Sequence, residues 1–88
     1  MKLKYNFETV DMGDEIICVP VGVGAEEVHG VLKLNKSGEK ILDLLKEETN
    51  IDRIAKKITG AYDNDPNEIY DYVRNTVDTL RKIGLIEG

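Results

Sequence analysis

The sequence predicts an α+β fold in which an N-terminal three-stranded antiparallel sheet precedes three helices. Up to Leu34, residues alternate between apolar and polar types or are rich in β-branched side chains, which is typical of half-buried strands. After Leu34, apolar residues recur every three or four positions, as they do on one face of a helix. A chain of 88 residues has room for one modest core, so we expect residues 1–88 to form one domain.

Three strands are expected in the first part of the chain. Lys2–Val10 alternates strictly, and Glu15–Val21 is rich in β-branched residues. Pro20 cannot donate a ladder hydrogen bond, so it should lie at an edge or near the end of its strand. A glycine-containing loop with the acidic pair Glu26-Glu27 precedes the third strand, Val28–Leu34. Short turns between these segments favour an antiparallel meander.

The first two helices begin at recognisable capping residues. Asn35 or Ser37 can cap the first helix. Thr49 with Asp52 resembles a capping pair for the second helix, which should end near Gly60. The apolar positions expected to face the core are Ile41, Leu42, Leu44 and Leu45 in the first helix and Ile51, Ile54, Ala55 and Ile58 in the second.

The third helix has the clearest boundaries. Asp65 is the expected N-cap, Pro66 the first helical residue and Gly84 the residue that ends the helix. Leu85-Ile86 should then fold back over the core. The stripe expected to face the core is Ile69, Val73, Thr76, Leu80 and Ile83.

The composition argues against several classes of function. Twelve basic and seventeen acidic residues give a formal charge of −5, which disfavours nucleic-acid binding. One histidine, His29, and one cysteine, Cys18, are too few for a zinc site and make poor candidates for catalysis. We therefore expect no catalytic residue, metal or cofactor. The lone cysteine and the absence of a signal peptide or a long apolar run lead us to expect a cytoplasmic protein without a membrane segment.

Nearly the whole sequence resembles the PqqD-like family, and the motifs that carry the resemblance lie from the expected third strand onward. Members read "L-x-L-N-x-(S/T)-(G/A)" into an amphipathic helix, and Leu32–Gly38 has this pattern. Ile51–Asp63 is similar to the family's "I-x-x-I-A" helix that ends in "Y-D", and Ile69–Ile86 is similar to its closing helix and "G-L-I" tail. The resemblance extends over roughly Leu3–Ile86.

The resemblance implies a winged helix-turn-helix fold that recognises ribosomally made, post-translationally modified peptides. In this family the leader of a precursor peptide adds as a strand to the third strand and lies in a groove against the third helix. The domain presents the peptide to a modifying enzyme, often a radical SAM protein, and performs no chemistry itself. In the namesake pathway the product is the cofactor pyrroloquinoline quinone (PQQ).

The residues themselves suggest where such a peptide would bind. The expected third strand has no proline and one charge, Lys33, so its edge is open to an added strand. On the third helix, the row beside the core stripe combines apolar and basic residues that could hold a leader with hydrophobic and acidic side chains. Tyr72 would replace Tyr70 in that row if the helix were rotated. The candidate peptide-binding residues are Val28, His29, Val31, Lys33, Tyr70, Arg74, Val77 and Arg81.

Other interpretations remain open at this point. The row on the third helix could be a solvated face whose arginines pair with Asp71 and Asp78. A winged-helix DNA-binding regulator is the alternative function, with Arg53, Lys56 and Lys57 as its basic cluster. A structural or dimerising subunit of a maturation complex, acting as a homodimer, is a third possibility.

Overall fold

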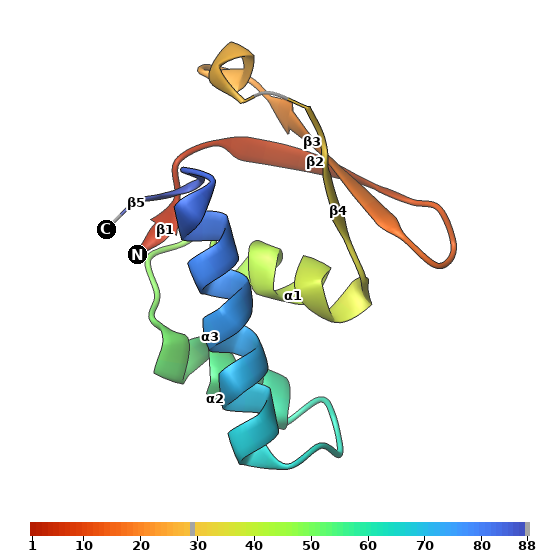
Figure 1. Ribbon diagram of the computed structural model, residues 1–88, viewed down its shortest axis with the longest axis vertical. Coiled ribbons are helices and arrows are strands. Elements are labelled where there is room, and N and C mark those ends of the chain that lie inside the picture. The colour runs from red at the N-terminus through yellow and green to blue at the C-terminus, as the bar shows by residue number, and fades with distance from the viewer. Residues whose placement is uncertain (29, 88) are drawn as a thin grey trace.

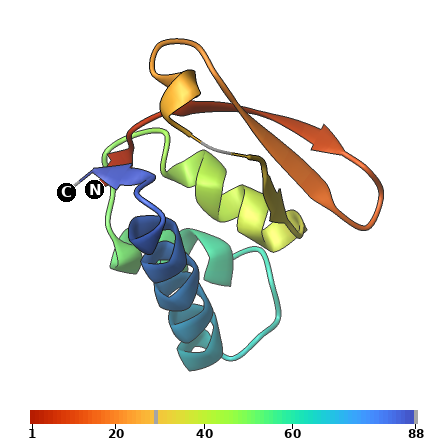
Figure 2. The ribbon, with the colours of Figure 1, turned by 45° about the horizontal axis from the view of Figure 1, so that its top comes forward.

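The computed structural model describes residues 1–28 and 30–87, which form two small antiparallel sheets and three α-helices. The helices lie on one side of the larger sheet (Figures 1 and 2). The elements in chain order are β1 (Lys2–Leu3), β2 (Asn6–Asp11), β3 (Ile16–Val21), the 3₁₀ turn η1 (Ala25–Glu27), β4 (Leu32–Leu34), α1 (Lys36–Leu44), α2 (Ile51–Thr59), α3 (Pro66–Lys82) and β5 (Ile86–Glu87).

The predicted order of a three-stranded antiparallel sheet followed by three helices is observed, but the strands differ in number. The sheet has the order β2-β3-β4, as expected for a meander. The expected first strand is divided, because β1 leaves the larger sheet and pairs with β5. The Lys4 amide donates to the Leu85 carbonyl at 2.9 Å and so joins the two ends of the chain, which lie side by side in Figures 1 and 2. The winged helix-turn-helix description stays a prediction.

The third strand is shorter than predicted, and Pro20 accounts for this. In β3, Cys18 pairs with Leu32, and continuing the register would place Pro20 opposite Gly30. Pro20 has no N–H to offer a third strand, and Gly30 has a φ of 85°, outside the β region. β4 therefore covers Leu32–Leu34 instead of Val28–Leu34. Pro20 lies near the end of β3, as expected.

Polar side chains cap all three helices. Asn35 caps α1 by accepting from the Gly38 amide at 2.8 Å, and Asp65 caps α3 by accepting from the Asn67 amide at 2.8 Å. The prediction of Thr49 as a cap is wrong. Asn50 directly precedes the first helical residue and caps α2 by accepting from the Arg53 amide at 2.9 Å, so the cap lies one position later than predicted.

α3 ends at Gly84, as predicted, with a φ of 83°. The Leu85 amide donates to the Leu80 carbonyl and the Gly84 amide donates to the Arg81 carbonyl, each at 3.0 Å. These two bonds form a Schellman motif, which reverses the chain after the helix. Leu85 and Ile86 are buried, so the expectation that they fold back over the core is confirmed.

One hydrophobic cluster joins both sheets and all three helices. The residues that α3 contributes differ from the predicted core-facing stripe. Val77, which was not in that stripe, is fully buried, whereas Ile83, which was, is 55% exposed. The helix is rotated toward α2, so its core face is centred between Val73 and Val77. The buried cluster comprises Leu3, Phe7, Ile16, Cys18, Ile41, Leu42, Leu45, Ile54, Ala55, Ile58, Ile69, Val73, Val77, Leu80, Leu85 and Ile86.

Candidate functional site

The outer edge of β4 carries no partner strand within residues 1–28 and 30–87. β4 is the last strand of the order β2-β3-β4, and its inner edge pairs with β3. Leu32 and Leu34 pack against the core, and Lys33 between them is exposed. Alternate backbone N–H and C=O groups on the outer edge of such a strand are available to another strand.

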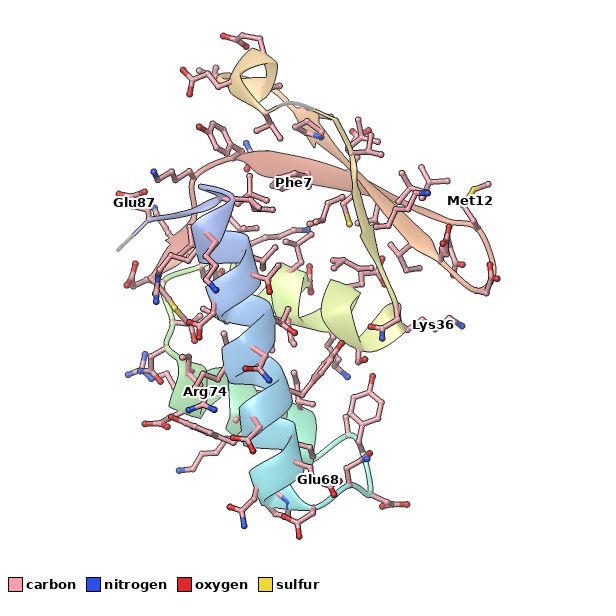
Figure 3. All side chains as sticks on the ribbon, in the orientation of Figure 1. Phe7, Met12, Lys36, Glu68, Arg74 and Glu87 are labelled. Atoms are coloured by element: carbon pink, nitrogen blue, oxygen red, sulfur yellow. The ribbon has the colours of Figure 1, made fainter. Side chains whose placement is uncertain are left out.

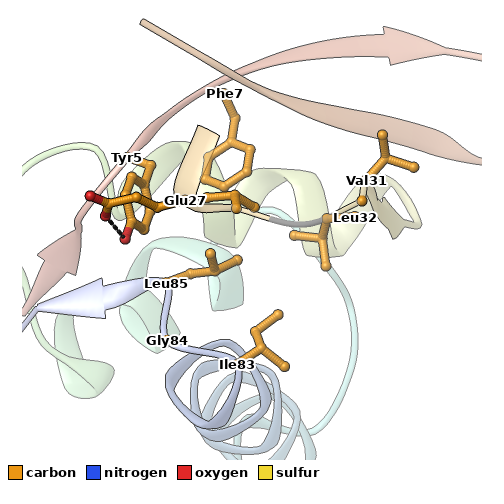
Figure 4. Close-up of a pocket in the computed structure, with 10 residues that line it drawn as sticks. Tyr5, Phe7, Glu27, Val31, Leu32, Ile83, Gly84 and Leu85 are labelled. Carbon is orange, nitrogen blue, oxygen red and sulfur yellow. Dashed lines mark hydrogen bonds between the residues drawn. The ribbon is translucent and has the colours of Figure 1, made fainter. Parts of the chain in front are cut away.

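A cavity of about 290 Å³ lies where the start of β4 meets the C-terminal end of α3. Phe7 and Leu85 contribute buried apolar walls, and Val31 and Ile83 contribute side chains that are 56% and 55% exposed. Figure 4 shows Ile83 and Leu85 below the cavity, with Leu32 and Val31 on another side and Phe7 above. The complete lining is Tyr5, Phe7, Glu27, Val28, Gly30, Val31, Leu32, Ile83, Gly84 and Leu85.

Tyr5 and Glu27 form the polar end of this cavity. The Tyr5 hydroxyl donates to Oε2 of Glu27 at 2.9 Å, and Figure 4 marks this bond. The hydrogen bond raises the pKa of the Tyr5 hydroxyl, and partial desolvation and the charges of Glu27 and Glu26 raise it further. The hydroxyl is therefore protonated at neutral pH and remains a donor.

A row of α3 residues continues from this cavity toward the start of α1. An α-helix turns about 100° per residue, so Tyr72, Thr76, Thr79 and Ile83 project from the same side of α3. The Tyr72 hydroxyl donates to Oδ1 of Asn35 at 3.0 Å, and Asn35 directly follows β4. We call the space between this row and the outer edge of β4 the β4–α3 groove. It runs from Ile83 at one end to Tyr72 at the other.

A second cavity, of about 460 Å³, lies at the Tyr72 end of the β4–α3 groove. Its lining is mostly apolar and aromatic. Tyr62 and Tyr72, 37% and 36% exposed, are the largest of these side chains. The complete lining is Ser37, Ile58, Tyr62, Asn64, Glu68, Ile69 and Tyr72. The groove therefore has a cavity at each end.

The strand residues predicted to bind peptide lie at or beside the groove. Val28 and Val31 line the first cavity. Lys33 lies on β4 but is exposed on the side away from the core, because Leu32 and Leu34 take the inward positions. His29 lies outside the described residues. The described strand residues of the prediction therefore lie at or next to the open edge of the larger sheet, and their role in peptide binding stays a prediction.

The helix residues predicted to bind peptide lie on the side of α3 that faces away from the β4–α3 groove. Tyr70, Arg74 and Arg81 project about 180° away from the groove-facing row. Tyr70 lines a hollow against α2, and Nη2 of Arg81 contacts Sδ of Met1 at 3.5 Å. Figure 3 shows Arg74 pointing away from Lys36, which begins α1. Val77 is part of the core, so its placement in an exposed row is wrong.

The sequence reasoning missed the groove residues that come from distant parts of the chain. Tyr5 and Phe7 belong to the first strand segment, and Ile83 and Leu85 flank the end of α3. Ile83 was assigned to the core because it continues the heptad-like spacing of α3. The available signal was Gly84, because the chain reverses at a glycine in this position and the apolar residue after it, Leu85, then packs on the core near the end of the helix.

The described residues offer neither an accessible cysteine nor a cluster of metal-binding side chains. Cys18 is fully buried in β3, and burial raises the pKa of its thiol, with the charge of Glu39 as a smaller cause. Such thiols are poor nucleophiles. In residues 1–28 and 30–87, no group of His, Cys, Asp and Glu side chains is placed to hold a metal ion.

None of the helices described is both long and apolar enough to span a bilayer.

Comparison with protein families identifies the chain. The model of the family described as coenzyme PQQ synthesis protein D (PqqD) matches residues 23–86, which is most of the sequence. The chain belongs to the PqqD family. The match includes β4, α3 and the connection between them, so the PqqD region contains both walls of the groove. The resemblance seen in the sequence is thereby confirmed, while a search of curated proteins finds no match.

A solved structure has the same fold as this PqqD chain. TbiB1, in a structure described as its complex with the TbiA(beta) leader peptide, matches with a TM-score of 0.73 and 23% sequence identity. The match covers 100% of this chain and 96% of TbiB1. At this identity the similarity establishes that the two proteins share a fold, and the match extends beyond residues 23–86 to the whole of this chain.

Proposed function

We propose that this PqqD-family chain is a non-catalytic recognition module that binds the leader of a ribosomally made precursor peptide. The leader would add as a strand to the outer edge of β4 and occupy the β4–α3 groove. The observation that carries the proposal is the open β4 edge beside an apolar cavity of about 290 Å³. Membership of the PqqD family and the shared fold with TbiB1, solved with a leader peptide, support it.

The two walls of the groove would contribute different parts of the binding free energy. Main-chain hydrogen bonds to β4 would supply affinity with little dependence on sequence, and side chains that enter the cavities would supply specificity. Val31 and Ile83 are each more than half exposed and would lose that exposure beneath a bound strand. Covering each of them would contribute about 1 kcal/mol.

The length of the groove sets the length of the leader segment. Tyr72 and Ile83 are separated by eleven positions of α3, which corresponds to ~16 Å at ~1.5 Å per residue. An extended peptide rises ~3.3 Å per residue, so about five residues would connect the two cavities. We therefore propose a leader motif with two apolar anchors separated by about five positions.

The bound leader would be passed to a modifying enzyme. We propose a radical SAM enzyme as this partner, on the basis of PqqD-family membership alone.

We also keep a homodimer as a testable state, because the outer edge of β2 is as open as that of β4 in the described structure. Sedimentation at several concentrations tests this state, and a strictly monomeric result removes it.

Titration of isotopically labelled protein with the leader encoded nearest its gene tests the proposal directly. Amide shifts should concentrate in residues 31–34 and 72–85 and saturate as peptide is added. A leader series with single backbone N-methyl groups then tests strand addition itself. Binding should be lost when methyl groups are placed at alternate positions, which face β4, and retained at the positions between. Saturable shifts confined to other surfaces would contradict the proposed site.

Ile83→Ala tests the helix wall of the groove. Removing most of this exposed side chain should weaken leader binding by roughly fivefold, or about 1 kcal/mol. Val10→Ala is the matched control, because Val10 is a similarly exposed β-branched residue, at 49%, on β2. The two variants should have equal thermal stability, and equal loss of binding in both would place the peptide elsewhere.

The DNA-binding alternative is not proposed further. On α3, Arg74 lies 3.5 Å from Asp71 and Arg81 lies 4.0 Å from Asp78, so each arginine faces an acidic neighbour. The basic cluster named for this alternative, Arg53, Lys56 and Lys57, lies on α2, and the formal charge of −5 disfavours phosphate binding by the chain as a whole. The predicted local pairing of these arginines is confirmed.

A further inference from the structure

We propose that the Tyr5–Glu27 end of the β4–α3 groove selects a basic side chain, Lys or Arg, in the bound leader. This inference rests on the proposed leader-binding function and adds the chemical class of one leader residue. The other described residues around the first cavity are uncharged, so the charge of Glu27 would decide which side chain fits at this end and in which register the leader lies.

Glu27 is exceptional among the residues around the cavity. Of the described residues that line it, Glu27 alone carries a charge, while Phe7, Val31 and Leu85 are among the apolar remainder. The groove-facing row of α3 from Tyr72 to Ile83 is also uncharged. A peptide strand in this groove therefore meets the Glu27 carboxylate where it passes η1, whereas the Glu68 carboxylate lies at the second cavity, at the opposite end.

The carboxylate is held in place but retains binding capacity. The Tyr5 hydroxyl donates to one oxygen of Glu27, and Figure 4 shows this pair side by side at the edge of the cavity. An ionised carboxylate has about four acceptor positions, so one phenol leaves room for an ammonium or guanidinium group. Tyr5 thus acts as a positioning residue for Glu27.

No described basic side chain neutralises this carboxylate. The ion pairs formed within residues 1–28 and 30–87 involve Glu48, Asp43, Asp71 and Asp78, and none involves Glu27. Glu26 adds a second negative charge on η1, and its charge reaches the Tyr5 hydroxyl. The site is therefore complementary to a cation, and the net charge of −5 would favour the approach of a basic segment.

The position of the basic residue follows from strand geometry. Side chains on an added strand alternate between its two faces, so every second residue points into the groove. The cavity beside Ile83 and the Glu27 carboxylate belong to the same hollow. The basic residue should therefore lie two positions from the apolar residue that occupies this cavity.

Selection from a phage library of random ten-residue peptides tests the inference without knowledge of the natural leader. Peptides selected on the unaltered protein should carry a large apolar residue with Lys or Arg two positions away. Selection on Glu27→Lys should replace that basic residue with Asp or Glu. Glu47→Lys is the matched control, since it makes the same charge change at an exposed residue outside the cavity, and its selected peptides should keep the basic residue.

Affinity measurements on one selected peptide complete the test. Changing its basic residue to Glu should weaken binding at least tenfold to the unaltered protein, and Glu27→Lys should restore most of that loss. Peptides that shift the amides of residues 31–34 but show no preference for a basic residue would overturn this inference and leave the proposed function standing. A library that yields no peptide with shifts in the groove would overturn both.

Discussion

At the residue scale, Asn35 connects the two walls of the groove. Its Oδ1 atom accepts from the Gly38 amide at 2.8 Å, from the Ser37 hydroxyl at 3.0 Å and from the Tyr72 hydroxyl at 3.0 Å. The first of these bonds caps α1, and the last ties α3 to the end of β4. Gly38 permits this arrangement, because a Cβ atom there would lie 3.2 Å from the Asn35 oxygen.

We predict that Asn35 and Tyr72 are energetically coupled. Asn35→Ala removes the cap and should lower the free energy of unfolding by about 1–2 kcal/mol, and Tyr72→Phe should lower it by about 1 kcal/mol. The double variant should lose ~0.5–1 kcal/mol less than the sum, because both changes remove the same bond. Urea denaturation measures all three values.

Tyr70→Phe is the control for this cycle. Tyr70 lies on the same helix with similar exposure, and its hydroxyl has no hydrogen bond to a described residue. This change should leave the unfolding free energy within about 0.5 kcal/mol of the original value. Strict additivity of the Asn35 and Tyr72 effects would show that the bond does not contribute in solution.

The interactions of Asn35 show which contacts the local sequence predicts and which it does not. Asn35 could be identified as a cap because capping depends on residues within three positions along the chain. Its bond to Tyr72 could not be identified, because the two residues are 37 positions apart and meet only when α3 has its observed rotation. The same applies to the Tyr5–Glu27 pair.

At the element scale, the end of α3 determines the shape of the groove. The Schellman motif at Gly84 turns the chain sharply, so Leu85 becomes a wall of the cavity while Ile83 remains exposed beside it. The glycine was readable from the sequence, but the cavity that it creates was not.

We predict that Gly84→Ala lowers the free energy of unfolding by about 1 kcal/mol. Gly84 has a φ of 83°, which alanine adopts poorly, although a Cβ atom would meet nothing within 4 Å. The loss should therefore arise from the backbone alone. Chemical denaturation measures it, and amide shifts near Leu85 report the change in the cavity wall.

Gly60→Ala is the matched control at the end of α2. Gly60 has a φ of −69°, and a Cβ atom there would lie 3.7 Å from the nearest atom, an ordinary contact. Alanine should thus be neutral or stabilising by ~0.5–1 kcal/mol. If both substitutions destabilised the protein equally, the left-handed conformation of Gly84 would not be the cause.

At the scale of the whole molecule, one core holds the sheets and helices together. Phe7 of β2, Leu45 after α1, Val77 of α3 and Ile86 of β5 belong to the same buried cluster. Because no element has a separate core, loosening one should loosen all. The walls of the groove should therefore be as stable as the molecule itself.

We predict that Val77→Ala destabilises the whole molecule in a single transition. Removing two buried methyl groups should lower the free energy of unfolding by about 2 kcal/mol, and circular dichroism and the Tyr signals should report the same midpoint. Arg74→Ala, one turn away and exposed, should cost less than about 1 kcal/mol. Separate midpoints for the sheet and helix signals would contradict a single domain.

The sequence alone determined the order of the larger sheet's three strands and of the helices, the Asp65 cap and the end of α3, and the resemblance to the PqqD family. All of these depend on residues close together in the chain. The sequence left Asn35 and Ser37 as alternatives for the cap of α1. Tertiary structure decided the rotation of α3, the shortened β4, the β1–β5 pairing and therefore which residues line the groove. Val77 and Ile83 illustrate the difference, because both continue the apolar spacing of α3 and only packing against α2 buries one and exposes the other. Periodicity defines the face of a helix to within a residue or two, whereas a binding groove depends on the exact side.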